Sequence, residues 1–142
     1  MKRPGSVLAL GVLAASCFGC STIGTRDPKV SLKDARLDAL IYDGPRPSRQ
    51  GTLPANSVGA VAIEELLAKK RGHWKSSLVS YVPNVYVRSE DFSINLMKGL
   101  IIINSAMEPG RKAQVVSDLT ADEFERASRA VSGSMVDDPQ KR

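Results

Sequence analysis

The stretch DFSINLMKGLIIIN, residues 91–104, decides the fold. Its first half alternates apolar and polar residues, as a strand with one buried face does. The apolar positions on that face are Phe92, Ile94 and Leu96. Lys98 and Gly99 then predict a tight turn into a second strand over residues 100–104, so the whole stretch reads as a β-hairpin. The second strand is apolar on both faces, which favours a central place in a sheet with a helix over one side.

Three further segments near the hairpin predict strands. They are WKSSLVSYV at residues 74–82, VYVRS at 85–89 and KAQVVSDL at 112–119. The inward residues have odd numbers at Val85 and Val87 but even numbers from Phe92 onward. Because side chains alternate with a period of two, this change predicts a turn or bulge within residues 89–91.

The segment SVGAVAIEELLAKKR, residues 57–71, predicts a helix. Asn56 or Ser57 can cap its first amides, and three cations occupy the last turn, where the helix dipole favours them. Gly72 follows as a residue suited to the left-handed end of a helix. The alternative is a strand over residues 58–63, since the glycine there weakens a helix.

A second helix is predicted over residues 121–131. Thr120 and Glu123 form a capping box, in which each side chain accepts a hydrogen bond from the other residue's backbone amide. Gly133 would lie just past the helix end. The predicted buried stripe consists of Phe124, Ala127 and Val131.

These elements predict one α+β domain over residues 57–133: a small, mainly antiparallel sheet of four to five strands with two helices packed on one face. Residues 134–142 are expected to form a flexible tail. Residues 20–56 are expected to be an N-terminal tether and a Pro/Gly-rich loop, with a short helix within residues 31–41. The loop is GPRPSRQGTLP at residues 44–54, whose three prolines exclude a helix or a central strand.

The N-terminus has the pattern of a signal peptide over residues 1–19. Two cations near the start precede an apolar run over residues 7–18, which is shorter than the roughly 20 residues that a membrane-spanning helix needs. Cys17 and Cys20 have the spacing of a redox pair, but a thioredoxin-like site would require a strand before them and a helix after them. The sequence predicts neither element there.

The residues Gly19-Cys20-Ser21 resemble the bacterial lipobox, in which a cysteine is acylated and becomes the first residue of the mature protein. Cys17 stands where the lipobox usually has an aliphatic residue, and Cys17 itself is the alternative acylation site. The resemblance implies three acyl chains, which anchor a protein permanently in a membrane. Ser21 in place of Asp implies the periplasmic face of the outer membrane of a Gram-negative bacterium. The alternative is a secreted protein that an ordinary signal peptidase cleaves.

Composition argues against a nucleic-acid partner. The formal charge of +5 falls to +3 when Lys2 and Arg3 leave with the signal peptide, and aromatic residues make up 5% of the chain. With Cys20 acylated and Cys17 removed, no thiol remains for a disulfide.

Few residues suggest catalysis or metal binding. His73 is the one histidine, so no histidine cluster can form. The adjacent carboxylates at 64–65, 90–91, 122–123 and 137–138 fall where helix caps, turns and solvation explain them. We therefore expect a protein that is not an enzyme and has no cofactor and no metal site.

The run KKRGHWK, residues 69–75, is a candidate interaction patch. The patch residues are Lys69, Lys70, Arg71, His73, Trp74 and Lys75. They could contact anionic lipid headgroups, lipopolysaccharide phosphates or an acidic partner, with Trp74 as an interfacial aromatic. The favoured interpretation is simpler, because cations are stabilising at any helix C-terminus.

The sequence thus predicts a small, non-enzymatic envelope lipoprotein that acts as a binding or accessory module for another envelope protein. The alternative is an inhibitor or immunity protein against a periplasmic hydrolase or toxin.

Overall fold

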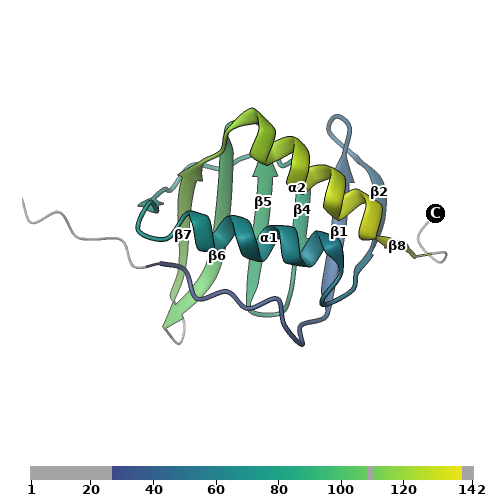
Figure 1. The fold of residues 1–142 in the computed structure, drawn as a ribbon. Coiled ribbons are helices and arrows are strands. Elements are labelled where there is room, and N and C mark those ends of the chain that lie inside the picture. Colours follow the sequence, from purple (N-terminus) through teal and green to yellow (C-terminus); the bar gives the residue numbers. More distant parts are fainter. Residues whose placement is uncertain (1–26, 109–110, 139–142) are drawn as a thin grey trace, which may run out of the picture.

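The computed structural model describes residues 27–108 and 111–138, which form an antiparallel sheet with two helices on one face (Figure 1). The elements in chain order are β1 Leu37–Tyr42, β2 Pro47–Leu53, α1 Val58–Lys69, β3 Lys75–Ser76, β4 Val85–Arg88, β5 Phe92–Met97, β6 Leu100–Glu108, β7 Arg111–Asp118, α2 Ala121–Ser134 and β8 Val136–Asp137. The predicted α+β class is confirmed. The described sheet has eight strands, however, so the prediction of four to five is wrong.

The strand order is β3-β7-β6-β5-β4-β1-β2-β8, and all neighbouring strands are antiparallel. The predicted hairpin is formed by β5 and β6, with Met97 paired to Leu100 across a two-residue turn. Gly99 in this turn has a φ of +90°, which glycine adopts without steric cost. Residues 101–103 of β6 are fully buried, in keeping with their apolar pattern on both faces.

The predicted change of parity occurs between β4 and β5. Val85 and Val87 are buried on the same side of the sheet as Phe92 and Ile94. The Ser89 amide donates to the Phe92 carbonyl at 2.9 Å and closes the turn between the strands.

Helix α1 forms with the predicted caps, so the alternative strand over residues 58–63 is wrong. The Ser57 hydroxyl accepts from the Ala60 amide at 3.2 Å, and Gly72 follows the helix with a φ of +74°. The alternative N-cap, Asn56, precedes the helix with a φ of +63°.

Helix α2 begins at the predicted capping box. The Glu123 amide donates to Thr120 Oγ1 at 3.2 Å, and the Thr120 amide donates to Glu123 Oε2 at 2.9 Å. The helix continues to Ser134, so Gly133 lies inside it rather than past its end.

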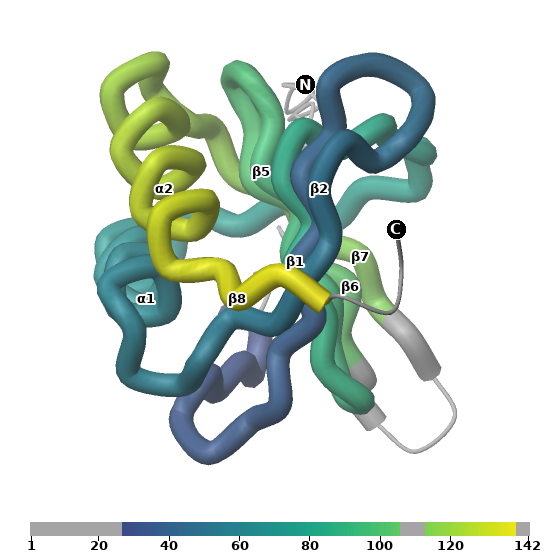
Figure 2. Tube along the Cα trace, turned by 90° about the vertical axis from the view of Figure 1, so that its right-hand side faces the viewer, coloured from purple at the N-terminus to yellow at the C-terminus, as the bar shows by residue number. Residues whose placement is uncertain are grey.

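Both helices lie side by side on one face of the sheet, as Figure 2 shows from the edge. The core that they enclose with the sheet includes Leu37, Leu53, Ile63, Ile94, Leu96, Ile101, Ile103 and Val131, each of which is fully buried.

Two strands, β1 and β2, lie within the segment 20–56 that was predicted to be a tether and a loop, and residues 20–26 of that segment lie outside the described residues. Residues 31–41 form no helix, because Asp34 has a φ of +62° and the chain then enters β1. The proline-rich segment contains β2, which tolerates Pro47 as its first residue and ends before Pro54. The folded part therefore begins before residue 57.

Two further predictions fail where the chain meets the edges of the sheet. Of the strand predicted over residues 74–82, the part that pairs with β7 is β3, at Lys75–Ser76. The predicted tail, residues 134–142, is partly structured. Ser134 is the last residue of α2, and Val136–Asp137 forms β8, which pairs with β2. Met135 between them is buried, which explains why this segment is held.

No helix in the described part of the chain is long and apolar enough to cross a membrane. The predicted signal peptide and the candidate acylation sites Cys17 and Cys20 lie outside the described residues.

Candidate functional site

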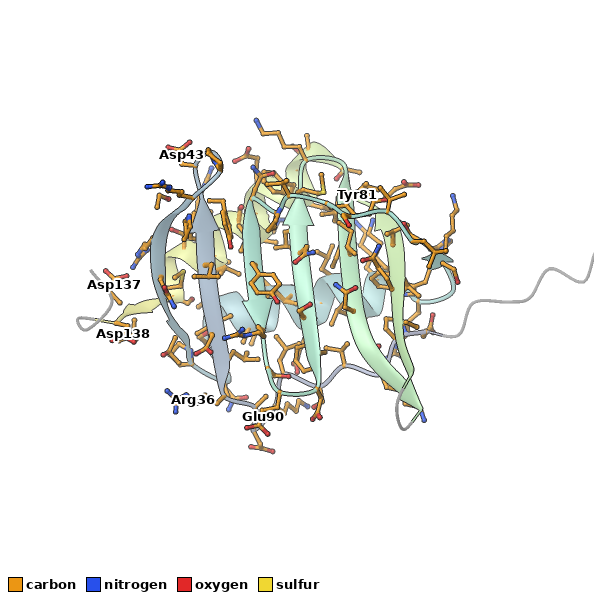
Figure 3. The ribbon with its side chains drawn as sticks, turned by 180° about the vertical axis from the view of Figure 1, so that it is seen from behind. Arg36, Asp43, Tyr81, Glu90, Asp137 and Asp138 are labelled. Atoms are coloured by element: carbon orange, nitrogen blue, oxygen red, sulfur yellow. The ribbon has the colours of Figure 1, made fainter. Side chains whose placement is uncertain are left out.

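The sheet face opposite the helices is covered by neither of them (Figure 3). Strand pairing places a row of largely apolar residues across its middle. The row consists of Leu40, Tyr86, Asn95, Ile102 and Val116, each paired with the next. We call this side the open face.

A polar row runs beside it on the open face. Its members are Thr52, Asp38, Arg88, Ser93, Asn104 and Gln114. Asn104 Nδ2 donates to Ser93 Oγ at 3.3 Å, and Arg88 pairs with Asp38 at 3.4 Å across exposed side chains. Surface ion pairs of this kind contribute little stability, so these groups can exchange partners at low cost.

Asn95 is the polar exception within the middle row. The residue is 8% exposed, and its Oδ1 has no hydrogen-bond partner among the described residues. A buried acceptor without a donor costs about 1–3 kcal/mol. The middle row therefore contains a buried acceptor that no described residue satisfies.

A segment over residues 77–84 crosses part of the open face, from β3 to the start of β4. The Gln114 side chain donates to the Val79 carbonyl at 2.7 Å, and the Ser77 and Tyr81 hydroxyls lie 3.1 Å apart. Figure 3 shows Tyr81 over the sheet on this segment. Three large apolar side chains on it are exposed: Leu78 at 101%, Val79 at 59% and Val82 at 70%. The sequence offered no sign of this exposure, because the same residues alternate as a buried strand would.

An open groove with a volume of about 920 Å³ lies at one end of the sheet. Arg36 and Glu90 mark this end in Figure 3. The charged residues that line the groove are Lys33, Asp34, Arg36, Asp38, Arg88, Glu90 and Asp91. Both signs of charge are therefore mixed along the groove.

The residues of the predicted interaction patch have different surroundings in the structure. Lys69 Nζ lies 2.6 Å from Glu123 Oε1, and Lys70 Nζ lies 2.8 Å from Glu123 Oε2. Hydrogen bonds to the Glu123 carboxylate lower its pKa to about 2. The largest effect comes from Lys69, followed by Lys70 and the Thr120 amide. The two lysines therefore join α1 to α2, a structural role that the sequence did not reveal.

Trp74 is 4% exposed and belongs to the core, so the prediction of an interfacial aromatic is wrong. Besides Lys69, whose side chain is 67% exposed although it pairs with Glu123, the exposed members of the patch are Arg71, His73 and Lys75. They follow one another around the turn at Gly72, between α1 and β3.

Asp27, the first described residue, is bonded to that turn. Its Oδ1 accepts from the Gly72 amide at 2.7 Å. Beyond it the chain passes a hollow that Val30, Leu67 and Trp74 help to line. The N-terminal segment therefore joins the fold beside the C-terminus of α1, which no pattern in the sequence predicted.

The described residues 27–108 and 111–138 contain no group of three or more His, Cys, Asp or Glu side chains that could hold a metal ion. His73 is exposed. No protein-family model, no curated protein and no solved structure matches the chain.

Proposed function

We propose that the chain is a small, non-enzymatic lipoprotein, anchored through Cys20 in the outer membrane of a Gram-negative bacterium and facing the periplasm. Its domain binds another envelope protein through the open face of the sheet. Cys17 is the alternative point of acylation.

The anchor is supported by the sequence. A short apolar segment ends in Gly19-Cys20-Ser21, and this pattern resembles the lipobox. The mature chain would begin only seven residues before Asp27, where the described fold starts. The domain would thus sit close to the membrane, as an accessory module of an envelope assembly would.

Asn95 is the observation that carries the binding function. Its buried and unpartnered Oδ1 lies in a row with Tyr86 and Ile102, where apolar surface surrounds it. Because Asn95 Oδ1 is buried, a donor from a partner reaches it only when the residues around it move. A partner that supplies this donor and covers the half-buried Leu40 and Tyr86 would gain both a hydrogen bond and apolar burial. Interfaces commonly combine an aromatic anchor with a small number of polar contacts in this way.

Photo-crosslinking in cells tests this function. A photoreactive phenylalanine analogue replaces Tyr86 on the open face, and in a matched control it replaces Glu125, which is exposed on α2 on the opposite side. We expect a discrete adduct from position 86 and none from position 125. An envelope-assembly protein in the adduct supports the proposal, and a periplasmic hydrolase or toxin supports the inhibitor alternative. Equal adducts from both positions, or none from position 86, contradict it.

Intact mass and detergent partitioning test the anchor separately. The wild-type protein should carry acyl chains and enter the detergent phase, and Cys20→Ala should accumulate as unacylated precursor. If Cys17→Ala alone has that effect, Cys17 is the acylated residue. An unmodified, water-soluble wild type would show that the lipobox interpretation is wrong.

A further inference from the structure

The anchor would join the fold at one edge of the sheet. Asp27 is fixed to the Gly72 turn, and β3 begins three residues after that turn. Figure 1 shows the described chain starting on the β7 side of the sheet, where β3 also lies. The seven residues from Cys20 to Asp27 span at most about 25 Å when fully extended.

This length is short compared with the domain. Neighbouring strands lie about 4.8 Å apart, so β3 and β8, at opposite ends of the strand order, are separated by roughly 34 Å. A tether attached beside β3 therefore holds that edge near the membrane. The β8 edge can approach the bilayer only if the domain rotates so that this edge faces the membrane, and the tether is shorter than the width of the sheet.

The edge held near the membrane exposes side chains suited to it. Leu78 is fully exposed and Val79 is 59% exposed, directly after β3. Arg71 and Lys75 are exposed at the adjoining turn. Apolar side chains flanked by cations are typical of proteins that rest in the interfacial region of a bilayer.

Charge is the smaller part of this attraction. Asp27 and Asp118 lie near the same turn, and Glu123 offsets the charges of Lys69 and Lys70. The excess of positive charge there is therefore small. Insertion of Leu78 and Val79 between lipid headgroups would supply most of the binding, because burying apolar area is favourable regardless of lipid charge.

We infer that the β3 edge, with the exposed Leu78 that follows it, rests on the bilayer in which the protein is anchored. The sheet then lies roughly perpendicular to the membrane plane, so the open face stays accessible to a protein partner. This inference rests on the acyl anchor of the proposed function.

Spin labelling of the acylated protein in vesicles of phosphatidylethanolamine and phosphatidylglycerol tests the orientation. A mature chain acylated at Cys20 retains no other thiol, so one introduced cysteine receives the label. The test position is Leu78→Cys, and the matched control is Val136→Cys in β8, which is also exposed. We expect the label at 78 to lose contact with a water-soluble nickel relaxant several-fold and to gain contact with oxygen. The label at 136 should keep the high accessibility to nickel that a label surrounded by water has.

The possible results separate the two proposals. Intact mass is measured on the same sample, and an unacylated protein overturns the anchor together with the orientation that depends on it. An acylated protein whose label at 78 is as accessible to nickel as the label at 136 overturns the orientation alone. An immersed label at 136 with an aqueous label at 78 shows the reverse orientation and likewise overturns the inference.

Discussion

Lys70 Nζ lies 2.8 Å from Glu123 Oε2, and the two side chains are only 14% and 11% exposed. The same carboxylate oxygen accepts the Thr120 amide at 2.9 Å, and Lys69 reaches the other oxygen. One carboxylate therefore caps α2 and binds the end of α1. The contacts with Lys69, Lys70 and the Thr120 amide lower the pKa of Glu123 from 4.5 to about 2.

Replacing this carboxylate should destabilise the fold in a pH-dependent way. Glu123→Gln keeps the capping box but leaves Lys70 without its counter-charge, so the free energy of unfolding at neutral pH should fall by about 1–3 kcal/mol. A carboxyl group whose pKa is lower in the folded state stabilises the fold above its unfolded pKa. This contribution is lost as the pH falls from 4.5 towards about 2, so wild type and variant should converge in urea unfolding over that interval.

Glu125→Gln serves as the control, since Glu125 is exposed on the same helix. It should change the free energy of unfolding by less than about 0.5 kcal/mol at any pH. A wild-type advantage over Glu123→Gln that is the same at every pH would refute the role assigned to the ionised carboxylate.

The two helices approach closely at Gly59. A Cβ there would lie 2.8 Å from Val131 Cα and 2.9 Å from the Ala130 carbonyl oxygen, so the backbones would have to separate. Gly59→Ala should therefore lower the free energy of unfolding by about 1–3 kcal/mol, despite the better helix propensity of alanine. Thermal and urea unfolding measure the change.

Gly133→Ala on the partner helix is the matched substitution. Nothing lies within 4 Å of a Cβ at Gly133, so alanine should raise the free energy of unfolding by about 0.4–1 kcal/mol. Equal effects of the two substitutions would show that the close approach of the helices at Gly59 does not control stability.

The sequence predicted the elements whose signals are local. The capping box at Thr120, the turn at Gly99 and the parity change after Val87 each depend on a few neighbouring residues, and each forms as predicted. Local signals fail for β2, where prolines concealed a strand that pairs with β1 from Pro47 to Leu53. They fail also for β3 and β8, whose two residues each are held by partners far along the chain.

The candidate site was harder to predict than the fold. The cations at residues 69–75 are visible in the sequence, but the pairing of Lys70 with Glu123 depends on how two helices pack. Trp74 alternates as a surface residue could, and its burial follows from the position of α1 over the sheet. Exposure of Leu78 and isolation of Asn95 Oδ1 are likewise tertiary properties that no single segment encodes.

Arg49 holds the C-terminal segment that the sequence left as a tail. Its Nη1 donates to the Ser132 carbonyl at 2.6 Å, near the end of α2, and its Nε lies 2.6 Å from Asp137 Oδ1 in β8. Arg49→Ala should lower the free energy of unfolding by about 2 kcal/mol and speed amide exchange at residues 135–138. Hydrogen exchange followed by NMR measures this local release.

Arg46→Ala, in the exposed connection between β1 and β2, should leave that exchange unchanged. If Arg49→Ala lowers global stability while protection at residues 135–138 stays as in the wild type, then the arginine does not hold β8, and the pairing with β2 and the burial of Met135 retain the strand.

Asn95 should show a conflict between stability and binding. Asn95→Val removes a buried acceptor that has no donor and adds a residue favoured in strands, so the free energy of unfolding should rise by about 1 kcal/mol. The same change should weaken the photo-crosslink from position 86, because the donor group of the partner would no longer find the Asn95 Oδ1 acceptor. Asn104→Val is the control: Asn104 donates to Ser93 Oγ at 3.3 Å, so its loss should not stabilise the fold. A variant at Asn95 that is both less stable and fully able to crosslink would mean that the side chain serves the fold and not a partner.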